Sequence, residues 1–546
     1  MTRQPLSTGA SSAEHAPAME QDGSGRERVT ESGWAPEIAE LQRRKAAAAE
    51  MGGPDKVALQ HAKGKLTVRE RIARLLDPGS FRELGSIAGT AKYAPDGRLE
   101  SFSPSNLLFG HGRLNGRPIV VSADDFTIRG GAADASIHEK QIQAEQMANE
   151  LRLPIVRLID GTGGGGSVKT LETQGHTYVP ANPGWNWVTD NLATVPVVCL
   201  GLGPVAGLGA ARLVSGHYTL LLRKQGYMFA AGPALVSALG TPVTKEELGG
   251  ALVHAKSGAV DDIAEDEDDA FDKARRFLSY LPSSVDTVAE RVPPTDPVDR
   301  CEPWLDEIVP RARQQVYKMR RILEGVLDKG SFFEIGAYWG KSSITGLARL
   351  DGWPVAVIAS DPMIYGGGWT VESSQKVTRF IELAETFHLP VVHFVDIPGV
   401  LIGVQAEKAG TIRHAARALA GVYQATVPWC TIIVRKTFGV AGAANLNHTR
   451  YRYRYAWPSG DWGSLPVEGG IEAAYKSQLE AADDPVKARK EIEAQLNRFR
   501  SPFLTAEKFL IEEIIAPRET RPLLCEFANL VSPLRKPGRV GFGFRP

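Results

Sequence analysis

The sequence TVPWCTIIVRKTFGVAGAAN, residues 426–445, predicts a buried strand that runs directly into a turn of small residues. The strand is expected at Cys430–Val434, and the turn follows at residues 439–444. A strand that ends in a Gly/Ala turn and then enters a helix leaves backbone N–H groups pointing at open space, where they can hold negative charge. A second stretch of this type, TVPVVCLGLGPVAGLGAA, occupies residues 194–211. The repetition raises the question of whether the whole chain is duplicated.

The two stretches belong to a duplication that covers most of the chain. Gly207 recurs as Gly439, 232 residues later, and LLDPGSFRELG (75–85) recurs as VLDKGSFFEIG (326–336) at an offset of 251. Further pairs share one offset of 236: segments 112–121 and 348–357, Gly130-Gly131 and Gly366-Gly367, Lys140 and Lys376, Leu153-Pro154 and Leu389-Pro390, and Asp160 and Asp396. A repeat of this length is a domain duplication and not the short period of a solenoid. Duplication for stability alone is one interpretation; two copies of the turn facing a shared cleft is the functional one.

Composition and charge limit the classes of function. The 546 residues suffice for two or three domains, and 43% hydrophobic with 23% charged residues is ordinary for a globular protein. A formal net charge of +0 argues against a nucleic-acid or membrane-surface role. No apolar run reaches the roughly 18 residues of a membrane span, and no secretory signal is expected. The four cysteines form no CxxC motif, which excludes a zinc ribbon and fits a reducing cytosol, so we expect a cytoplasmic protein.

The chain divides into two domains with a tail at each end. Residues 1–33 are rich in Ser, Gly, Ala and Pro and are expected to form a disordered tail. We assign residues 34–300 to an N-terminal domain and residues 301–527 to a C-terminal domain. The last residues, 528–546, contain too much Gly, Pro and Arg for regular structure, so they are expected to pack on a surface or a partner.

Strands and helices are expected to alternate in the first domain. Short apolar runs predict strands at residues 119–122, 155–159, 195–200 and 218–222. Helices are expected at residues 136–151 and at Ala274–Leu281, where the preceding acidic run Asp261–Asp272 is interpreted as a solvated helix start and not as a metal site. This alternation predicts an α/β fold with much parallel pairing. Residues 301–330 are interpreted as the linker, at the start of the second domain, and a basic helix, Arg311–Leu327, is expected in it.

Three further stretches leave alternatives open. The loop GTGGGGS, Gly161–Ser167, is either a flexible linker or, as we favour because it follows a buried strand directly, a loop whose backbone approaches a substrate closely. Arg435-Lys436 is either a surface pair or a contact to an anionic ligand. TRYRYRY (449–455) is interpreted as a strand with tyrosines on one face, in preference to a surface that stacks on RNA.

The common catalytic motifs are missing from the sequence. The histidines form no HExxH or other close ligand set, no Ser lies in a G-x-S-x-G elbow, and WGKSS at Trp339–Ser343 lacks the glycine spacing of a phosphate loop. Turns of the oxyanion-hole type are present twice instead. A reaction at the α-carbon of a thioester passes through an enolate, which backbone N–H donors stabilise by on the order of 3 kcal/mol each.

The chain also resembles a known family. The segments that carry the resemblance are HAKGKLTVRERIARLLDPGSFRELG (61–85), Gly130-Gly131, GPVAGLGAA (203–211), ELGGALVHAKSGAVDDIAEDEDDA (247–270), FVDIPGVLIGVQAEKAG (394–410), RKTFGVAGA (435–443) and IIAPRETRPLLCE (514–526). Over residues 36–527 they resemble the carboxyltransferase (β) subunits of biotin-dependent acyl-CoA carboxylases, the group of propionyl-CoA and methylcrotonyl-CoA carboxylases.

The resemblance implies a fold, an assembly and a reaction. The fold would be two tandem crotonase-like (ClpP/crotonase) β-β-α superhelix domains, with acyl-CoA bound mainly to the first and biotin to the second. The active site would lie between the first domain of one subunit and the second domain of its neighbour, in a homohexamer built as a trimer of dimers. Carboxybiotin would lose CO₂, the biotin enolate would remove the acyl α-proton, and the thioester enolate would attack CO₂.

Partners and cofactors follow from what the chain lacks. It has no Met-Lys-Met biotinylation site and no evident ATP-binding segment. The resemblance therefore implies biotin on a separate carrier, a biotin carboxylase partner and acyl-CoA as substrate. No metal, nucleic acid or membrane span is expected.

The resemblance also assigns site residues. The N–H groups of Gly207 and Leu208 would hold the thioester oxygen, and those of Val440 and Ala441 the ureido oxygen of biotin. Contacts to CoA and the acyl group are expected from Gly130, Gly131, Gly163, Gly164 and Ala206, and the biotin and acyl pocket from Phe438, Gly439, Gly442 and Ala443. Leu208 and Val440 replace glycines that are usual in the family, so donation by their backbone requires that φ stays negative.

Other departures from the family pattern concern the acyl pocket. The family's Asp-Ser-Gly-Gly-Ala-Arg loop is here residues 160–165, without the arginine, and the aspartate of Gly-Gly-Ala-Tyr-Asp is replaced by Ala443. The resulting hypothesis is an acyl pocket that is larger or differently shaped than in propionyl-CoA carboxylases. Two alternatives remain: the carboxyltransferase of a carboxyacyl-CoA decarboxylase, and a catalytically degenerate structural subunit.

Overall fold

The computed structural model describes residues 33–132, 136–161, 172, 175–177, 179, 181–541 and 544–546. The expected N-terminal tail, apart from its last residue, lies outside the described residues. The same holds for residues 162–171, which include Gly163 and Gly164 of the glycine loop.

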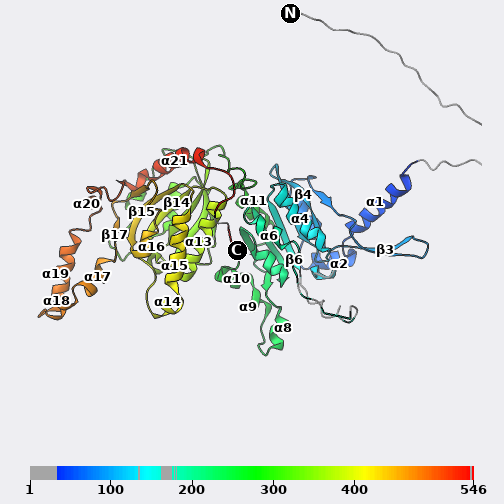
Figure 1. The fold of residues 1–546 in the computed structure, drawn as a ribbon, viewed down its shortest axis with the longest axis horizontal. Helices are drawn as coiled ribbons and strands as arrows, with labels where there is room; N and C mark the ends of the chain where they lie inside the picture. The colour runs from blue at the N-terminus through cyan, green and yellow to red at the C-terminus, as the bar shows by residue number, and fades with distance from the viewer. Residues whose placement is uncertain are drawn as a thin grey trace, which may run out of the picture.

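The first domain is built on an eight-stranded sheet with the order β1-β4-β5-β6-β7-β8-β10, in which β9 pairs with β7 (Figure 1). The first three strands of this order are antiparallel, and the remaining pairs are parallel. The strands are β1 (Arg82–Leu84), β4 (Leu107–Leu114), β5 (Arg117–Asp124), β6 (Ile155–Gly161), β7 (Val197–Ala206), β8 (Tyr218–Leu222), β9 (Tyr227–Phe229) and β10 (Asp262–Ala264), with a separate hairpin of β2 (Gly89–Tyr93) and β3 (Leu99–Pro104). The four strands expected from apolar runs are confirmed.

The second domain repeats this sheet in the order β11-β12-β13-β14-β15-β16-β18, with β17 paired to β15. Its strands are β11 (Phe333–Ile335), β12 (Ser343–Leu350), β13 (Trp353–Ser360), β14 (Val391–Ile397), β15 (Trp429–Phe438), β16 (Tyr453–Ala456), β17 (Asp461–Gly463) and β18 (Glu513–Ile514). The expected strand in the TRYRYRY segment is confirmed over Tyr453–Ala456.

Strand registers confirm the duplication residue by residue. In the first sheet Leu107 of β4 lies opposite Asp124 of β5, and in the second Ser343 of β12 lies opposite Ser360 of β13. Both residues of the pair are displaced by the same 236 positions. The offset found from shared glycines and prolines is therefore the offset of the folded structure.

Helices cover both faces of the first sheet. Helices α4, α6 and α7 pack on one face, and α3 and α11 pack together on the other. The helices of this half are α1 (Ala35–Ala49), α2 (Pro54–Ala62), α3 (Val68–Leu75), α4 (His138–Glu150), α6 (Trp185–Asn191), α7 (Leu208–Val214), α8 (Pro233–Ala238), α9 (Lys245–Gly249), α10 (Ala251–Ser257), α11 (Glu267–Ser279) and the 3-10 turn η1 (Arg129–Gly131). The acidic run does begin a helix, but α11 starts at Glu267, inside the run, because Asp266 caps it by accepting from the Asp269 N–H.

The second sheet is covered in the same way. Helices α13, α15 and α16 lie on one face, while α12 and α21 pack together on the other. The helices of this half are η3 (Pro303–Glu307), α12 (Met319–Val326), η4 (Tyr365–Gly367), α13 (Val371–Thr386), α14 (Val404–Lys408), α15 (Thr411–Gln424), α16 (Gly439–Ala443), α17 (Val467–Ala474), α18 (Lys476–Glu480), α19 (Pro485–Asn497), α20 (Pro502–Ala506), η5 (Pro517–Glu519), α21 (Thr520–Val531) and η6 (Ser532–Leu534). Helix α21 runs past residue 527, where the second domain was expected to end.

The prediction of a basic helix at Arg311–Leu327 is wrong for its first half, because the helix covers only Met319–Val326. Residues 311–318 are tied to the second domain instead: Arg313 pairs with Asp461 at 3.0 Å, and the Tyr317 hydroxyl donates to Asp396 at 2.8 Å. These tertiary contacts hold the segment outside a helix despite its helical composition.

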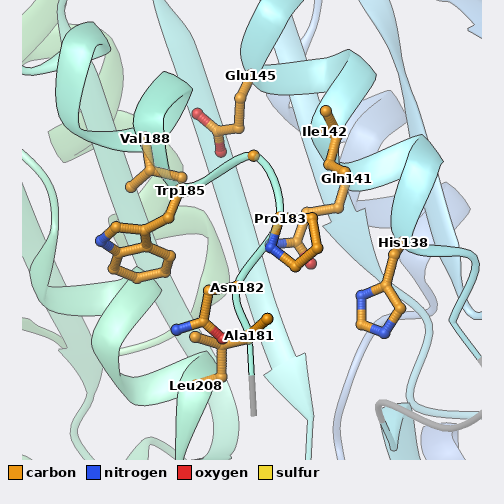
Figure 2. Close-up of a pocket in the computed structure, with 11 residues that line it drawn as sticks. His138, Gln141, Ile142, Glu145, Ala181, Asn182, Pro183, Trp185, Val188 and Leu208 are labelled. Carbon is orange, nitrogen blue, oxygen red and sulfur yellow. The ribbon is translucent and has the colours of Figure 1, made fainter. Parts of the chain in front are cut away.

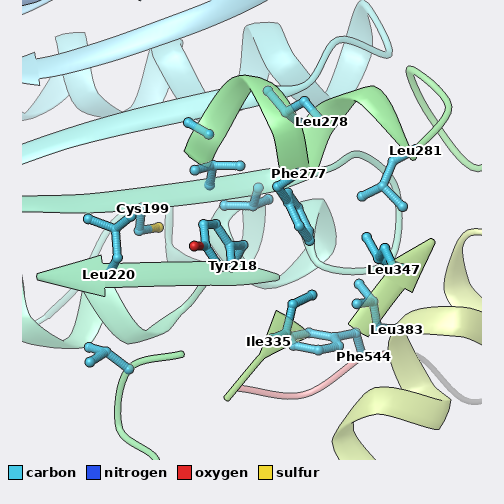
Figure 3. Close-up of a cluster of buried hydrophobic side chains, with 14 of the residues drawn as sticks. Cys199, Tyr218, Leu220, Phe277, Leu278, Leu281, Ile335, Leu347, Leu383 and Phe544 are labelled. Atoms are coloured by element: carbon cyan, nitrogen blue, oxygen red, sulfur yellow. The ribbon is translucent and has the colours of Figure 1, made fainter. Parts of the chain in front are cut away.

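The two domains share part of one hydrophobic core (Figure 3). Tyr218 of β8 stacks on Phe277 of α11 with ring centroids 5.0 Å apart, and its edge meets Phe333 of the second domain at 5.3 Å. The C-terminal tail packs into the same junction: Phe544 is buried and lies 4.6 Å from the ring of His217. The junction is thus apolar, and the tail is part of it. In the described part of the chain, no helix is long and apolar enough to cross a membrane.

Candidate active site

The first turn of interest joins β7 to α7. β7 ends at Ala206, which pairs with Phe229 of β9, and Gly207 follows with φ 58° and ψ −123°. A Cβ atom on Gly207 would meet nothing within 4 Å, so the backbone angles, and not lack of space, require glycine here. The turn exposes the N-terminal end of α7, where a helix leaves its first N–H groups without intrahelical partners.

The Gly207 N–H, which is predicted to hold the thioester oxygen, already has a hydrogen-bond partner in this structure. That N–H donates to the Phe229 carbonyl at 3.1 Å, because β9 pairs with the end of β7. Among the described residues, the N–H groups of Leu208 and Gly209 have no hydrogen-bond partner. Leu208 has a negative φ, so its backbone can donate as a glycine's would, and its side chain is 37% exposed. Its role remains a prediction.

The second turn has the same form. β15 ends at the buried Phe438, Gly439 follows with φ 60°, and the short helix α16 contains Val440 and Ala441. Neither Val440 nor Ala441 has a positive φ, and among the residues that the structure describes their N–H groups have no hydrogen-bond partner. Val440 is 42% exposed, while Ala441 is buried. The second copy therefore offers both predicted donors, in contrast to the first.

Two predicted pocket residues follow on α16. A Cβ atom on Gly442 would lie 2.7 Å from the carbonyl carbon of Thr437, so the helix packs tightly against the end of its own strand. Ala443, one residue on, is exposed. A side chain larger than alanine has room at residue 443 but not at residue 442.

The glycine pair predicted to contact CoA packs against the end of β6. A Cβ atom on Gly131 would lie 2.4 Å from the Asp160 carbonyl oxygen, and the equivalent atom on Gly367 would lie 2.1 Å from that of Asp396. Gly130 precedes Gly131 in η1 and has φ 63°. Both copies therefore need glycine because two backbones approach closely.

A buried carboxylate lies behind each turn, Asp160 in the first domain and Asp396 in the second, and neither was among the predicted site residues. In the first domain Asp160 pairs with Lys65 at 2.5 Å and Arg71 at 2.9 Å, and Arg71 also pairs with Glu267 at 2.7 Å. Burial lowers the pKa of Lys65. Lys65 and Arg71 lie in the 61–85 segment that carries the family resemblance. That segment was therefore the one feature of the sequence that could have indicated partners for Asp160.

In the second domain the carboxylate is Asp396. It accepts from the Tyr317 hydroxyl at 2.8 Å, from Arg435 at 3.0 Å and from the Lys436 N–H at 3.0 Å. Arg435 is only 4% exposed, so the interpretation of Arg435-Lys436 as a surface pair is wrong for the arginine. Burial, followed by the charge of Asp396, raises the pKa of Tyr317 well above its ordinary value. The network fixes the end of β15 directly before the turn.

The two carboxylates differ in one contact that follows from the sequence. The residue equivalent to Lys436 in the first copy is Pro204, which has no N–H to donate. Asp160 Oδ1 is correspondingly buried without a hydrogen-bond partner among the described residues. In place of the missing N–H contact, Asp160 pairs with two cationic side chains, Lys65 and Arg71, whereas Asp396 pairs with one, Arg435.

A small hollow of about 30 Å³ lies beside the first turn (Figure 2). Leu208 lies at one side, Trp185 and Val188 of α6 form one wall, and Ile142 of α4 forms the opposite wall. The full lining is His138, Gln141, Ile142, Glu145, Ala181, Asn182, Pro183, Gly184, Trp185, Val188 and Leu208. All of these residues belong to the first domain. The second turn contributes nothing to this pocket, so within one chain the two turns are not brought together there.

Metal chemistry has no candidate ligand set in the described part of the chain, where no group of three His, Cys, Asp or Glu side chains is placed to hold an ion. His217 and His393 are among the buried histidines. Burial lowers the pKa of His217 to about 3 and that of His393 to about 4. Both imidazoles are therefore neutral at pH 7 and hydrogen-bond to backbone carbonyls, at Leu192 and Asn445.

Comparisons with known proteins agree on one family. The sequence profile described as Carboxyl transferase domain matches residues 59–533. The chain is 35% identical over 508 residues to the propionyl-CoA carboxylase, carboxyltransferase subunit, of Haloferax mediterranei, covering 91% of this chain and 96% of that protein. It is 33% identical over 479 residues to the methylmalonyl-CoA carboxyltransferase 12S subunit of Propionibacterium freudenreichii subsp. shermanii, covering 86% of this chain and 89% of that protein.

Solved structures are similar over the same span. The transcarboxylase 12S hexamer with methylmalonyl-coenzyme A and methylmalonic acid bound aligns with a TM-score of 0.82 at 28% identity, covering 93% of this chain and 98% of that one. A single-chain, multi-domain long-chain acyl-CoA carboxylase aligns with a TM-score of 0.77 at 25% identity, covering 90% of this chain and 50% of that one.

Proposed function

Because the chain belongs to the carboxyl transferase domain family, we propose that it moves a carboxyl group from carboxybiotin to the α-carbon, or the vinylogous γ-carbon, of an acyl-CoA. The family assignment confirms the resemblance found in the sequence, and the predicted fold of two tandem crotonase-like domains is confirmed as well. The chain is thus a carboxyltransferase of the kind found in biotin-dependent acyl-CoA carboxylases.

The observation that carries the proposal is the repeated turn. Each domain ends a central strand at a glycine with φ near 60°, Gly207 or Gly439, and then starts a short helix whose first N–H groups have no partner among the described residues. Two such turns suit a reaction in which negative charge develops on two different oxygens. No side-chain base is needed for that chemistry.

In the first domain, the N–H groups of Leu208 and Gly209 would hold the thioester oxygen of the acyl-CoA. Gly209 replaces Gly207 in this role because the Gly207 N–H is already bonded to β9. Two donors in a site shielded from water would stabilise the enolate by on the order of 3 kcal/mol each. The hollow between Trp185, Ile142 and Leu208 beside these donors has a volume of about 30 Å³, room for a water molecule or two, so the acyl-CoA would lie over the open side of the turn.

In the second domain, the N–H groups of Val440 and Ala441 would donate to the ureido oxygen of biotin. Both are without a partner among the described residues, and Gly439 leaves the approach open, since a Cβ there would meet only one atom, 3.5 Å away. The residues therefore fit a carbonyl-type acceptor. Carboxybiotin, when bound, supplies the carboxyl group. The Asp396 network keeps β15 in place, so the donors keep their direction.

The acyl group differs, in this proposal, from the propionyl group of the named relatives. Ala443 is exposed at the end of α16, where the family resemblance places an aspartate, and the side chains of Leu208 and Val440 stand at the two turns. These changes support an acyl pocket of different size and polarity.

Assembly and partners are also proposals. The structural relative is described as a hexamer, which supports a homohexamer here, in which a neighbouring subunit would complete the site. A biotin carboxylase and a biotin carrier would supply carboxybiotin. All four cysteines are free thiols, and this supports a reducing compartment such as the cytosol.

The reverse half-reaction tests the proposal. Purified chain is incubated with biocytin and malonyl-, methylmalonyl- or longer and branched carboxyacyl-CoA, and release of the decarboxylated acyl-CoA is followed by chromatography. We expect turnover that depends on biocytin and favours one member of the panel. If the chain is hexameric and binds CoA but releases no product from any member, it is a structural subunit and the proposal fails.

A further inference from the structure

A second, larger pocket lies in the second domain. Its volume is about 680 Å³, within the range of sites that bind nucleotide-sized ligands. It lies between residues 305–313 of the linker, the end of β15, residues 457–461 that lead into β17, and residues 497–503 that lead into α20, with Ala516 and Pro517 completing the wall. Figure 1 shows β15, β17 and α20 at this end of the domain. The turn donors of α16 do not line this pocket.

Basic side chains dominate the polar wall of the pocket. Five basic residues line it against two acidic ones, Arg311, Arg313, Arg435, Lys436 and Arg500 against Asp306 and Asp461, while Arg435 and Arg500 also pair with Asp396 and Glu468, which do not line the pocket. The chain as a whole has a formal net charge of +0, so this excess is local. Clustered positive charge in a concave site concentrates anions.

The ion pairs of the wall leave two of these cations unneutralised. Asp461 is shared by Arg313 at 3.0 Å and Arg500 at 2.5 Å. Arg311 and the Lys436 ammonium have neither a hydrogen bond nor an ion pair among the described residues. Arg500 also pairs with Glu468 at 2.8 Å. The two cations of the wall without a partner among the described residues, Arg311 and Lys436, are therefore the groups that would attract a multiply charged anion.

An apolar wall faces the charged one. Leu305, Val309, Pro310, Pro502 and Phe503 line it, and Phe503 is 54% exposed. An exposed aromatic ring beside arginines offers a stacking surface for a flat, polar ring system. The pocket thus combines a place for phosphates with a place for a base.

We propose that this pocket binds an adenosine phosphate, with the phosphates on Arg311, Arg313 and Lys436 and the adenine against Phe503. Arginine presents a planar fork of donors that matches phosphate oxygens, and lysine adds a point charge. The inference does not depend on carboxyl transfer. The pocket is connected to the second turn through the backbone. Lys436 lines the pocket, its N–H donates to Asp396, and Gly439 follows three residues later.

Calorimetric titration of the full chain tests the site. ADP is the probe, and we expect saturable binding of one ADP per chain. The double variant Arg311→Ala/Lys436→Ala should weaken ADP binding by about tenfold or more, because two charge-assisted contacts to phosphate are lost. Lys490→Ala, which removes an exposed lysine of α19, should bind ADP as the unaltered chain does.

Lys436→Glu is a second variant, and it should abolish ADP binding. Its thermal midpoint should stay near that of the unaltered chain, because the Lys436 side chain has no partner to lose. The inference is overturned if ADP does not bind the unaltered chain, or if the double variant binds ADP as tightly as Lys490→Ala does.

A CoA titration distinguishes two sources of the adenosine phosphate. If the pocket takes the nucleotide end of CoA, CoA will bind with a second equivalent per chain that the double variant loses. If it takes a free nucleotide, CoA will bind with one equivalent in both proteins and ADP will not compete with it. Either result supports the site, and biocytin-dependent transfer measured on the same preparations reports separately on the proposed function.

Discussion

Replacing Gly207 by alanine tests whether the first turn acts through its backbone. At φ 58° and ψ −123° an alanine is strained by about 1–3 kcal/mol. The strain comes from the dihedral angles alone, since a Cβ atom there meets nothing within 4 Å. A rotation of the peptide between residues 207 and 208 relieves it. That rotation breaks the hydrogen bond from the Ala211 N–H to the Gly207 carbonyl, which is worth about 1 kcal/mol.

The strain of about 1–3 kcal/mol at residue 207 equals or exceeds the roughly 1 kcal/mol of the hydrogen bond that is lost, so rotation of the peptide is favoured. A rotated peptide turns the Leu208 N–H away from the open side of the turn, so the thioester oxygen would lose one donor. Loss of one oxyanion donor costs about 3 kcal/mol, or roughly 100-fold in kcat. We therefore expect Gly207→Ala to lower the biocytin-dependent turnover about 100-fold while the thermal midpoint falls by only a few degrees.

The assay is release of decarboxylated acyl-CoA, measured beside thermal unfolding at fixed protein concentration. Gly232→Ala is the matched control, because Gly232 has a negative φ and equal space for a Cβ atom. The control should keep its turnover. Turnover of Gly207→Ala within twofold of the unaltered chain would refute the reasoning, since the first turn would then not act through the Leu208 N–H.

Three other predictions use residues of the second domain. Ala443→Asp should shift the ratio of kcat/KM values between short and long carboxyacyl-CoA substrates, because it restores a carboxylate at an exposed position beside the turn; an unchanged ratio would contradict the role given to this residue. Asp396→Ala should destabilise the fold by about 3–5 kcal/mol, because Arg435 would be left buried without its carboxylate, and thermal unfolding against the exposed control Asp483→Ala would show whether it does. Burial lowers the pKa of His393 to about 4 from 6.5, so the unfolded chain takes up a proton between these pH values while the folded chain does not. The share of stability that depends on a neutral His393 is therefore present above pH 6.5 and is lost as the pH falls to 4, by about 3 kcal/mol; His393→Gln should flatten that part of the pH profile, and a profile identical to that of the unaltered chain would disprove the assignment.

The sequence was sufficient to predict the duplication and the two turns, because glycine and proline mark backbone geometry directly. Gly207 and Gly439 each have a positive φ that other residues adopt only with strain. Their equivalent positions in the two copies therefore indicated the same turn in both domains. The helix and strand alternation followed from hydrophobic periodicity. These features depend on residues close together in the sequence.

The features that could not be predicted depend on tertiary contacts. The Gly207 N–H is engaged because β9 pairs beside β7, and nothing in residues 194–211 indicates that pairing. Residues 311–318 have a helical composition, but Tyr317 is held by Asp396 instead. Arg435 is buried because it pairs with Asp396, a residue of the preceding strand that local sequence around Arg435 does not indicate. Each error arose where a long-range ion pair or strand pairing overrides local preference.

Transfer of labelled carboxyl to biotin tests the central claim most directly. The purified chain is mixed with biocytin and the preferred carboxyacyl-CoA, labelled with ¹³C at its carboxyl group, and the products are followed by NMR. The account predicts that label appears on biocytin as the acyl-CoA loses it, and that Gly439→Ala, which disturbs the Val440 and Ala441 donors, suppresses the transfer. Label that appears only as bicarbonate, at a rate independent of biocytin, would contradict the account.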